Sequence, residues 1–221
     1  MKLFLSIIVF VALVCPPHPH NAFKLRPHSR ISEMPQVVLI TSPCSRCSGF
    51  VVANGFVATA AHCASFKGER LDVTFTNGKT EQFTVVVFKK NFRGFSPEDV
   101  AILKGPTLGI HPIPLVKPHK GAQWCVTMGW GGELGKDGNP VQRVSLCRLD
   151  DKHYDRAGLI AGHGEVDHGD SGGPTLIDRG AIGLNESIAA FDLPLFWSVP
   201  SSSISAALRE AQEAAHKRRS K

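Results

Sequence analysis

The stretch Gly169–Pro174 reads GDSGGP and is the most specific motif in this sequence of 221 residues. A serine hydroxyl is a poor nucleophile near neutral pH unless a base removes its proton and hydrogen-bond donors stabilise the oxyanion that follows. The glycines permit a tight backbone bend, so the amides of Gly169 and Ser171 can both point at one developing negative charge. The stretch therefore predicts a nucleophilic Ser171 with an oxyanion-binding site beside it.

Two further stretches supply the partners that such a serine requires. His62 lies in the sequence TAAHC at Thr59–Cys63, and Asp99 begins the sequence DVAIL at 99–103. A free imidazole titrates at about pH 6.5, which suits a group that accepts and returns a proton near neutrality. Alone, His62 would be interpreted as a surface residue and Asp99 as part of a turn. Together with Ser171 they indicate a general base, an orienting carboxylate and a nucleophile.

The three motifs, in the chain order His62, Asp99, Ser171, resemble those of the trypsin/chymotrypsin family of serine endopeptidases. The resemblance implies that His62 is the general base, that Asp99 is a buried carboxylate fixing the imidazole tautomer, and that Ser171 is the nucleophile. It also implies an oxyanion hole formed by the amides of Gly169 and Ser171. The expected reaction is a two-step acyl transfer, which uses no metal ion and no cofactor.

Short β-rich runs separated by turn residues follow one another from position 36 onward. The first of them are rich in β-branched and aromatic residues and cover Val37–Ile40, Gly49–Ala53, Phe56–Ala60, Leu71–Thr76 and Phe83–Lys89. The Asn-Gly pairs at 54–55 and 77–78 are typical of hairpin turns. More strand-like runs lie within 123–199, and an apolar stripe at helical spacing after them predicts a C-terminal helix.

The resemblance gives these runs an architecture. It implies an all-β fold of two six-stranded antiparallel β-barrels with a C-terminal α-helix. Prolines keep the segment between the two sets of strands out of a sheet and suit it to a linker. The triad would lie in the cleft between the barrels. The expected peptidase domain covers residues 36–217, with barrel 1 at about 36–104, the linker at 105–121, barrel 2 at about 122–200 and the helix at 201–217.

The N-terminal residues are typical of an export signal. Lys2 precedes the apolar run Leu3–Val14, which is too short for a comfortable membrane span. We therefore expect a signal peptide at 1–15 and a leader or activation segment at 16–35. The mature protein is expected to be secreted and extracellular, or periplasmic if the source is bacterial, and monomeric with no stable membrane span.

Export places the cysteines in an oxidising compartment, where they form disulfides. The resemblance implies a bridge between Cys47 and Cys63. Cys125 and Cys147 lie in successive strand-like runs and could bridge across a hairpin. Cys44 would then be unpaired, or it would pair with Cys147 instead.

Asp170 has a separate role in the resembling family, where its carboxylate pairs with a new N-terminal ammonium produced by activation cleavage. Arg30-Ile31 is a plausible tryptic site, but only four residues, Ile31–Met34, then precede Pro35 and the first strand. Either activation differs in this chain, or Asp170 finds another cation.

Substrate preference is expected to follow from the residues around the serine. By resemblance, Glu165 occupies the base of the specificity pocket, and Asn185 and Ser187 belong to the substrate-binding strand. A carboxylate at the pocket base favours cleavage after Lys or Arg. Ile188 stands where the family has glycine and could block the pocket mouth, so cleavage after small residues is the alternative.

Two functions remain to be compared. The first is a secreted serine endopeptidase whose partners are protein or peptide substrates and protein inhibitors, with no nucleic acid. The second is a protease-fold binding protein whose basic surface engages anionic lipid, glycan or nucleic acid. The net charge of +6 and the basic residues of the last five positions allow the second. The presence of His62, Asp99 and Ser171 favours the first.

Overall fold

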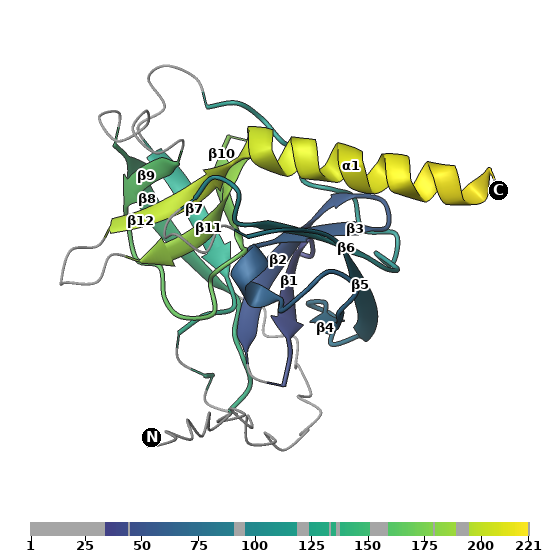
Figure 1. Cartoon of the computed structure of the whole chain (residues 1–221). Coiled ribbons are helices and arrows are strands. Elements are labelled where there is room, and N and C mark those ends of the chain that lie inside the picture. The colour runs from purple at the N-terminus through teal and green to yellow at the C-terminus, as the bar shows by residue number, and fades with distance from the viewer. Residues whose placement is uncertain are drawn as a thin grey trace, which may run out of the picture.

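The computed structural model describes residues 34–43, 45–90, 96–118, 124–132, 134–135, 138–150, 159–178, 180–188 and 195–220. Within them the chain forms two closed β-barrels of six strands each and a C-terminal helix (Figure 1), which confirms the predicted all-β double barrel. The predicted signal peptide and nearly all of the leader lie outside the described residues. None of the described helices combines the length and apolar character that a membrane span requires.

The first barrel is closed in the order β1-β2-β3-β6-β5-β4. Its strands are β1 (Val37–Thr41), β2 (Arg46–Ala53), β3 (Phe56–Thr59), β4 (Arg70–Thr74), β5 (Thr80–Lys89) and β6 (Val100–Lys104). Gly55 and Gly78 have φ angles of 79° and 80°. Because glycine adopts positive φ at little cost, the two Asn-Gly pairs form the turns that the sequence predicted. Phe50, Phe75 and Phe83 fill the barrel interior and are fully buried.

The second barrel is closed in the order β10-β11-β12-β9-β8-β7. Its strands are β7 (Trp124–Gly129), β8 (Arg143–Leu149), β9 (Ile160–His163), β10 (Pro174–Ile177), β11 (Gly180–Ile188) and β12 (Leu195–Pro200). Cys125 and Cys147 face each other in the β7–β8 register and form a disulfide. This decides between the pairings that the sequence left open for Cys147; Cys44 lies outside the described residues.

The C-terminal helix α1 (Ser201–Arg219) leaves the second barrel and extends over the first (Figure 1). It contacts β5 and β6 of the first barrel and β11 and β12 of the second. Ile204, Ala207 and Ala211 of the predicted apolar stripe are buried in this contact. The Nζ atom of Lys89 on β5 lies 3.0 Å from a carboxylate oxygen of Glu210 on the helix. The helix therefore packs on both barrels.

The barrels approach each other closely at Gly172, which has a φ angle of 85°. A Cβ atom added there would collide with the carbonyl oxygen of Ser48 on β2 and with Oγ1 of Thr59 on β3. Those two groups are themselves joined, because the Thr59 hydroxyl donates to the Ser48 carbonyl at 2.7 Å. The second glycine of the GDSGGP stretch is therefore required both by its backbone conformation and by the contact between barrels.

We expect Gly172→Ala to destabilise the fold more than an alanine at another glycine of positive φ. The matched control is Gly109→Ala, where φ is 75° and nothing lies within 4 Å of the added Cβ. Strain alone should lower the free energy of unfolding by about 1 kcal/mol in the control. Overpacking should lower it by about 1 to 3 kcal/mol more in Gly172→Ala. Urea unfolding of both variants measures the difference, and equal losses would contradict the close inter-barrel contact.

Candidate active site

The pairing of β3 with β6 brings His62 and Asp99 together. His62 lies in the 3₁₀ turn Ala61–Cys63 that follows β3, and Asp99 directly precedes β6. Asp99 is 6% exposed and accepts two hydrogen bonds from His62, one from the backbone amide at 2.9 Å and one from ring Nδ1 at 2.6 Å. An ionised carboxylate only accepts, so Nδ1 is the donor in this bond, and in the neutral imidazole the lone pair of Nε2 is then free. This is the tautomer that a general base needs.

A disulfide fixes the turn that carries His62. Cys63, the next residue, is bonded to Cys47 on β2 with a Cα–Cα distance of 6.0 Å. The pairing is the one that the family resemblance implied. Since Cys47 is itself within a barrel strand, the cross-link ties the turn to the barrel wall and limits the positions open to the imidazole.

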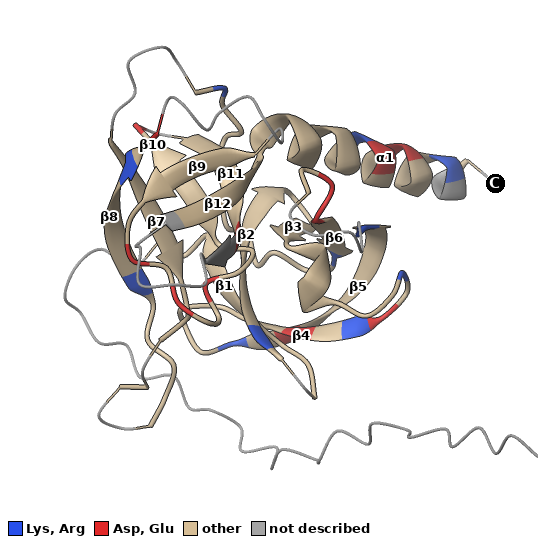
Figure 2. Ribbon diagram, turned by 60° about the vertical axis from the view of Figure 1, so that its left-hand side comes forward, with Lys and Arg blue, Asp and Glu red and all other residues tan. Residues whose placement is uncertain are grey.

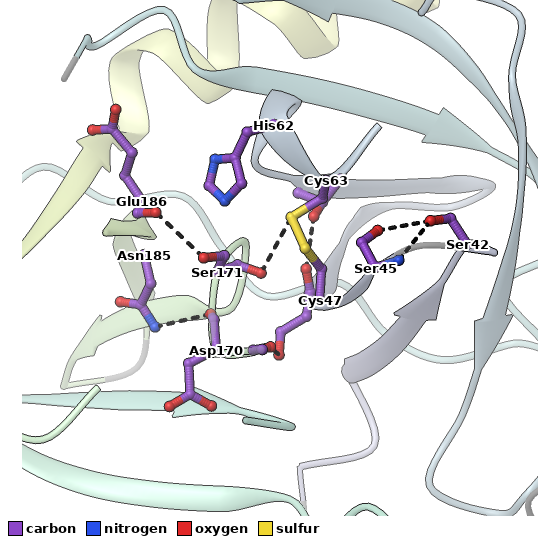
Figure 3. The surroundings of a disulfide bond; sticks show 12 residues. Ser42, Ser45, Cys47, His62, Cys63, Asp170, Ser171, Asn185 and Glu186 are labelled. Carbon is purple, nitrogen blue, oxygen red and sulfur yellow. Dashed lines mark hydrogen bonds between the residues drawn. A yellow bond between two sulfur atoms is a disulfide. The ribbon is translucent and has the colours of Figure 1, made fainter. Parts of the chain in front are cut away.

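Ser171 lies in the turn that precedes β10, and its carbonyl accepts the amide of Ser48 on β2 of the first barrel. The imidazole of His62 points toward the Ser171 side chain from the turn after β3 (Figure 3). The Ser171 hydroxyl itself donates to the main-chain carbonyl of Glu186 at 3.3 Å. The structure thus brings the three predicted residues to one place, with the hydroxyl turned to a neighbouring carbonyl.

Ser48 holds the backbone on both sides of the candidate nucleophile. The Ser48 amide donates to the carbonyl of Ser171 at 2.8 Å, and its hydroxyl donates to the carbonyl of Gly169 at 2.7 Å. The amides of Gly169 and Ser171 donate no hydrogen bond to any other residue within the described ranges. With their carbonyls anchored and their amides free, the two residues offer a pair of N–H donors to a ligand.

Asp170 stands between those two amides, and its carboxylate is buried, 4% exposed. Oδ1 accepts from the amide of Gly131 at 2.7 Å, and Oδ2 accepts from the amide of Asp167 at 2.9 Å. Arg143 Nη1 lies 3.9 Å from Asp170 Oδ2 and 3.2 Å from Asp167 Oδ2. Burial raises the pKa of Asp170 above its usual value, against the opposing effects of the two amides and Arg143. Among the described residues, Arg143 is the cation that lies beside Asp170.

The three residues predicted to bind substrate lie in different surroundings. Glu165 is exposed and lines a surface hollow together with β8 and His163. Asn185 is fully buried, and its amide Oδ1 accepts a hydrogen bond from the Thr175 hydroxyl at 2.8 Å. Ser187 pairs with Trp197 through the β11–β12 register, and its side chain lies outside the described part of the chain. The substrate-binding role of all three stays a prediction.

Glu186 is the residue at the site that sequence reasoning missed. Its carboxyl is 6% exposed, and Oε1 accepts from the amide of Ser96 at 3.0 Å. Oε2 is buried and has no partner among the described residues. Burial, and secondarily the charge of Asp99, raises the pKa of Glu186 to about 7, while the Ser96 amide and His62 act against the shift. The available signal was an isolated acid within the otherwise uncharged strand sequence GAIGLNESI.

The Glu186 carboxyl predicts a pH-dependent stability. Its folded-state pKa of about 7 exceeds the ordinary value of 4.5, so the stability that protonation contributes is complete below pH 4.5 and is lost as the pH rises to about 7. Glu186→Gln keeps the acceptor for the Ser96 amide and removes the titration. Its free energy of unfolding, relative to the native sequence, should rise between pH 4.5 and 8 in urea titrations.

Glu98→Gln is the matched control, because Glu98 is exposed in the same loop as Ser96. It makes the same Glu-to-Gln change at an exposed position, so it measures what the change alone does to the free energy of unfolding at each pH. A difference between Glu186→Gln and the native chain that stays constant from pH 4.5 to 8 would show that Glu186 does not titrate as stated.

Comparison with protein families and curated proteins gives one consistent group of relatives. The Trypsin family model matches residues 26–193. Granzyme B of Homo sapiens is 29% identical over 195 residues, which are 72% of this chain and 76% of that protein. Granzyme B of Rattus norvegicus is 28% identical over 193 residues, which are 72% of this chain and 77% of that protein.

Solved structures agree with this grouping at the level of the fold. The serine endoprotease from Yersinia pestis has a TM-score of 0.67 at 19% identity; the likeness covers 80% of this chain and 63% of that one, less than two thirds. The Rv3671c protease of M. tuberculosis H37Rv, in an inactive form, has a TM-score of 0.59 at 25% identity and covers 80% of this chain and 89% of that one.

Proposed function

The chain belongs to the trypsin family and is a serine-type endopeptidase, and we propose that His62, Asp99 and Ser171 are its catalytic triad. The observation that carries this proposal is the 2.6 Å hydrogen bond between His62 Nδ1 and the buried Asp99, on an imidazole that points toward Ser171. That bond leaves Nε2 as the only basic ring atom, on the side from which a serine proton can be taken.

In the proposed reaction the Ser171 hydroxyl turns from the Glu186 carbonyl to His62 Nε2. His62 takes the proton as Ser171 Oγ forms a bond to the scissile carbonyl carbon, and the carbonyl electrons move to oxygen. The C–N bond then breaks as the carbonyl re-forms, and His62 gives its proton to the leaving amine nitrogen, which produces the acyl-enzyme. Water next attacks the ester carbon while His62 takes its proton; the bond to Ser171 Oγ breaks, and His62 returns the proton to Ser171. Asp99 stabilises the imidazolium throughout, because it keeps its charge and its two hydrogen bonds to His62.

The oxyanion of the tetrahedral intermediate would be held by the amides of Gly169 and Ser171. Support comes from their lack of other acceptors within the described residues and from the anchoring of both carbonyls by Ser48. Donors that are fixed before the reaction stabilise the developing charge without further reorganisation, and a single such donor contributes on the order of 10²-fold to 10³-fold in kcat.

The proposed preference is for cleavage after Lys or Arg, and the proposed location is outside the cell. Two acidic residues beside the nucleophile loop support the first proposal, since a carboxylate attracts a cationic substrate side chain. They are Glu186, whose carbonyl accepts from the Ser171 hydroxyl, and Asp167, whose amide donates to Asp170. Glu165 is the pocket-base residue that the family resemblance implies. The disulfides Cys47–Cys63 and Cys125–Cys147 support the second, because such bonds persist in oxidising compartments.

The binding-protein alternative depends on a coherent basic surface. Figure 2 shows basic and acidic residues interleaved along β4, β5 and α1 in the described part of the chain. Some of them are paired, such as Lys79 with Glu81 at 2.8 Å. Paired charges attract an anionic partner less than a patch of one sign does. The described charges therefore favour the endopeptidase over the binder.

We expect Ser171→Ala and His62→Ala each to lower kcat roughly 10⁶-fold, the loss typical when a triad nucleophile or base is removed. Ser202→Ala, at an exposed position of α1, and His111→Ala, at an exposed position between β6 and β7, are the matched controls and should retain turnover. Hydrolysis of a protein substrate and labelling by a fluorophosphonate probe measure the effect, with thermal unfolding as the check on folding. Most activity remaining in folded His62→Ala would exclude its role as base, and a folded native chain that neither labels nor hydrolyses would favour the binder.

Profiling on a peptide library tests the preference. The native chain is expected to cleave after Lys or Arg, and Glu165→Gln to reduce that preference by about tenfold, the effect of losing roughly 1.4 kcal/mol of charge pairing. Glu186→Gln in the same assay shows whether the buried carboxyl contributes instead. Preference of the native chain for Ala or Val would contradict the acidic pocket and would indicate that Ile188 narrows its entrance.

A further inference from the structure

An ion pair joins the buried carboxylate of Asp170, which lies between the oxyanion donors in sequence, to the half-buried side chain of Arg143. The Asp170 carboxylate is flanked in sequence by the two free amides, at Gly169 and Ser171, so its position sets the direction of both. Burying an unpaired carboxylate costs several kcal/mol, which makes a nearby cation a condition for this arrangement. The guanidinium of Arg143 meets that condition, 3.9 Å from Asp170 and 3.2 Å from Asp167.

Glycines make room for this ion pair. A Cβ on Gly131 would lie 2.6 Å from Asp170 Oδ1, and a Cβ on Gly132 would collide with Arg143 Nη1. Gly129 pairs with Arg143 in the β7–β8 register, and its added Cβ would also meet Asp170. The side chains of Asp170 and Arg143 therefore pack against the backbone of the three glycines at positions 129, 131 and 132, where any larger residue would collide with them.

The start of the described chain is held next to this pair. Gln142, the neighbour of Arg143, accepts a hydrogen bond from the Met34 amide at 2.8 Å and donates to the Met34 carbonyl at 3.1 Å. Met34 is only three residues after Ile31, the first residue that cleavage at Arg30-Ile31 would free. These two hydrogen bonds hold the chain at Met34 to the sequence neighbour of Arg143, and they form without a new amino terminus.

We propose that Arg143 is a positioning residue that acts through Asp170 to hold the amides of Gly169 and Ser171 ready for the oxyanion, so that the chain is active without cleavage at Arg30-Ile31. This inference rests on the proposed function of Ser171. In this chain the guanidinium of Arg143 takes the place of the N-terminal ammonium group that the family resemblance implies. This guanidinium is present as soon as the second barrel has folded.

The first test compares variants of Arg143 in the full chain. Arg143→Ala should lower kcat on the order of 10²-fold with a much smaller change in KM, because the oxyanion donors act in the transition state. It should weaken binding of a peptide boronate, which forms a tetrahedral adduct, by a similar factor. Arg143→Lys should keep more activity than Arg143→Gln, and added methylguanidinium should partly restore Arg143→Ala. Arg148→Ala, at an exposed position of the same strand, is the matched control and should retain native kcat.

The second test needs no change near the site. The full chain with Arg30→Gln should hydrolyse substrate and take up a fluorophosphonate at the native rate, and mass spectrometry of labelled native protein should find residues 30 and 31 still joined. Labelling confined to chains that begin at Ile31 would overturn the proposal, and so would folded Arg143→Ala with kcat within threefold of native. If Arg143→Ala does not fold, Arg143→Lys and Arg30→Gln carry the test. Failure of both intact and trimmed chains to label would instead refute the proposed function.

Discussion

The hydrogen bonds of Ser48 join the two barrels at the candidate nucleophile. Ser48 is fully buried on β2 of the first barrel and bonds through its hydroxyl and its amide to the carbonyls on either side of Asp170. The same hydroxyl accepts the amide of Trp130, just beyond β7, at 2.8 Å. One side chain of the first barrel thereby fixes the loop that carries Ser171 and the end of a strand of the second barrel.

The active-site geometry follows from this junction. His62 follows β3, the strand paired with β2, so fixing Ser171 against β2 also fixes its position relative to the imidazole. The two barrels approach each other closely at Gly172, which is why the motif needs a glycine directly after the nucleophile. The second barrel contributes the other constraint through Asp170, whose buried carboxylate is held by two amides and Arg143. The base and the oxyanion donors are thus positioned from different barrels.

Sequence alone was sufficient for features that are local or that form motifs. The Asn-Gly turns, the double barrel and the grouping of His62 and Asp99 with Ser171 were all predictable on that basis. Contacts between distant segments were not. Glu186 and Ser96 are 90 residues apart, and the burial of this acid depends on a loop of the other barrel. Arg143 on β8 donates to Asp167, which lies 24 residues later in the chain. The pairing of Cys147 likewise required the β7–β8 register.

The most direct measurement is a crystal structure of the protein after reaction with a peptide phosphonate. The expected result is a covalent bond from Ser171 Oγ to phosphorus, one phosphoryl oxygen within hydrogen-bond distance of the amides of Gly169 and Ser171, and His62 Nε2 beside the adduct. A phosphonate bonded to another residue, or an adduct oxygen pointing away from both amides, would contradict the convergence of the two barrels on Ser171.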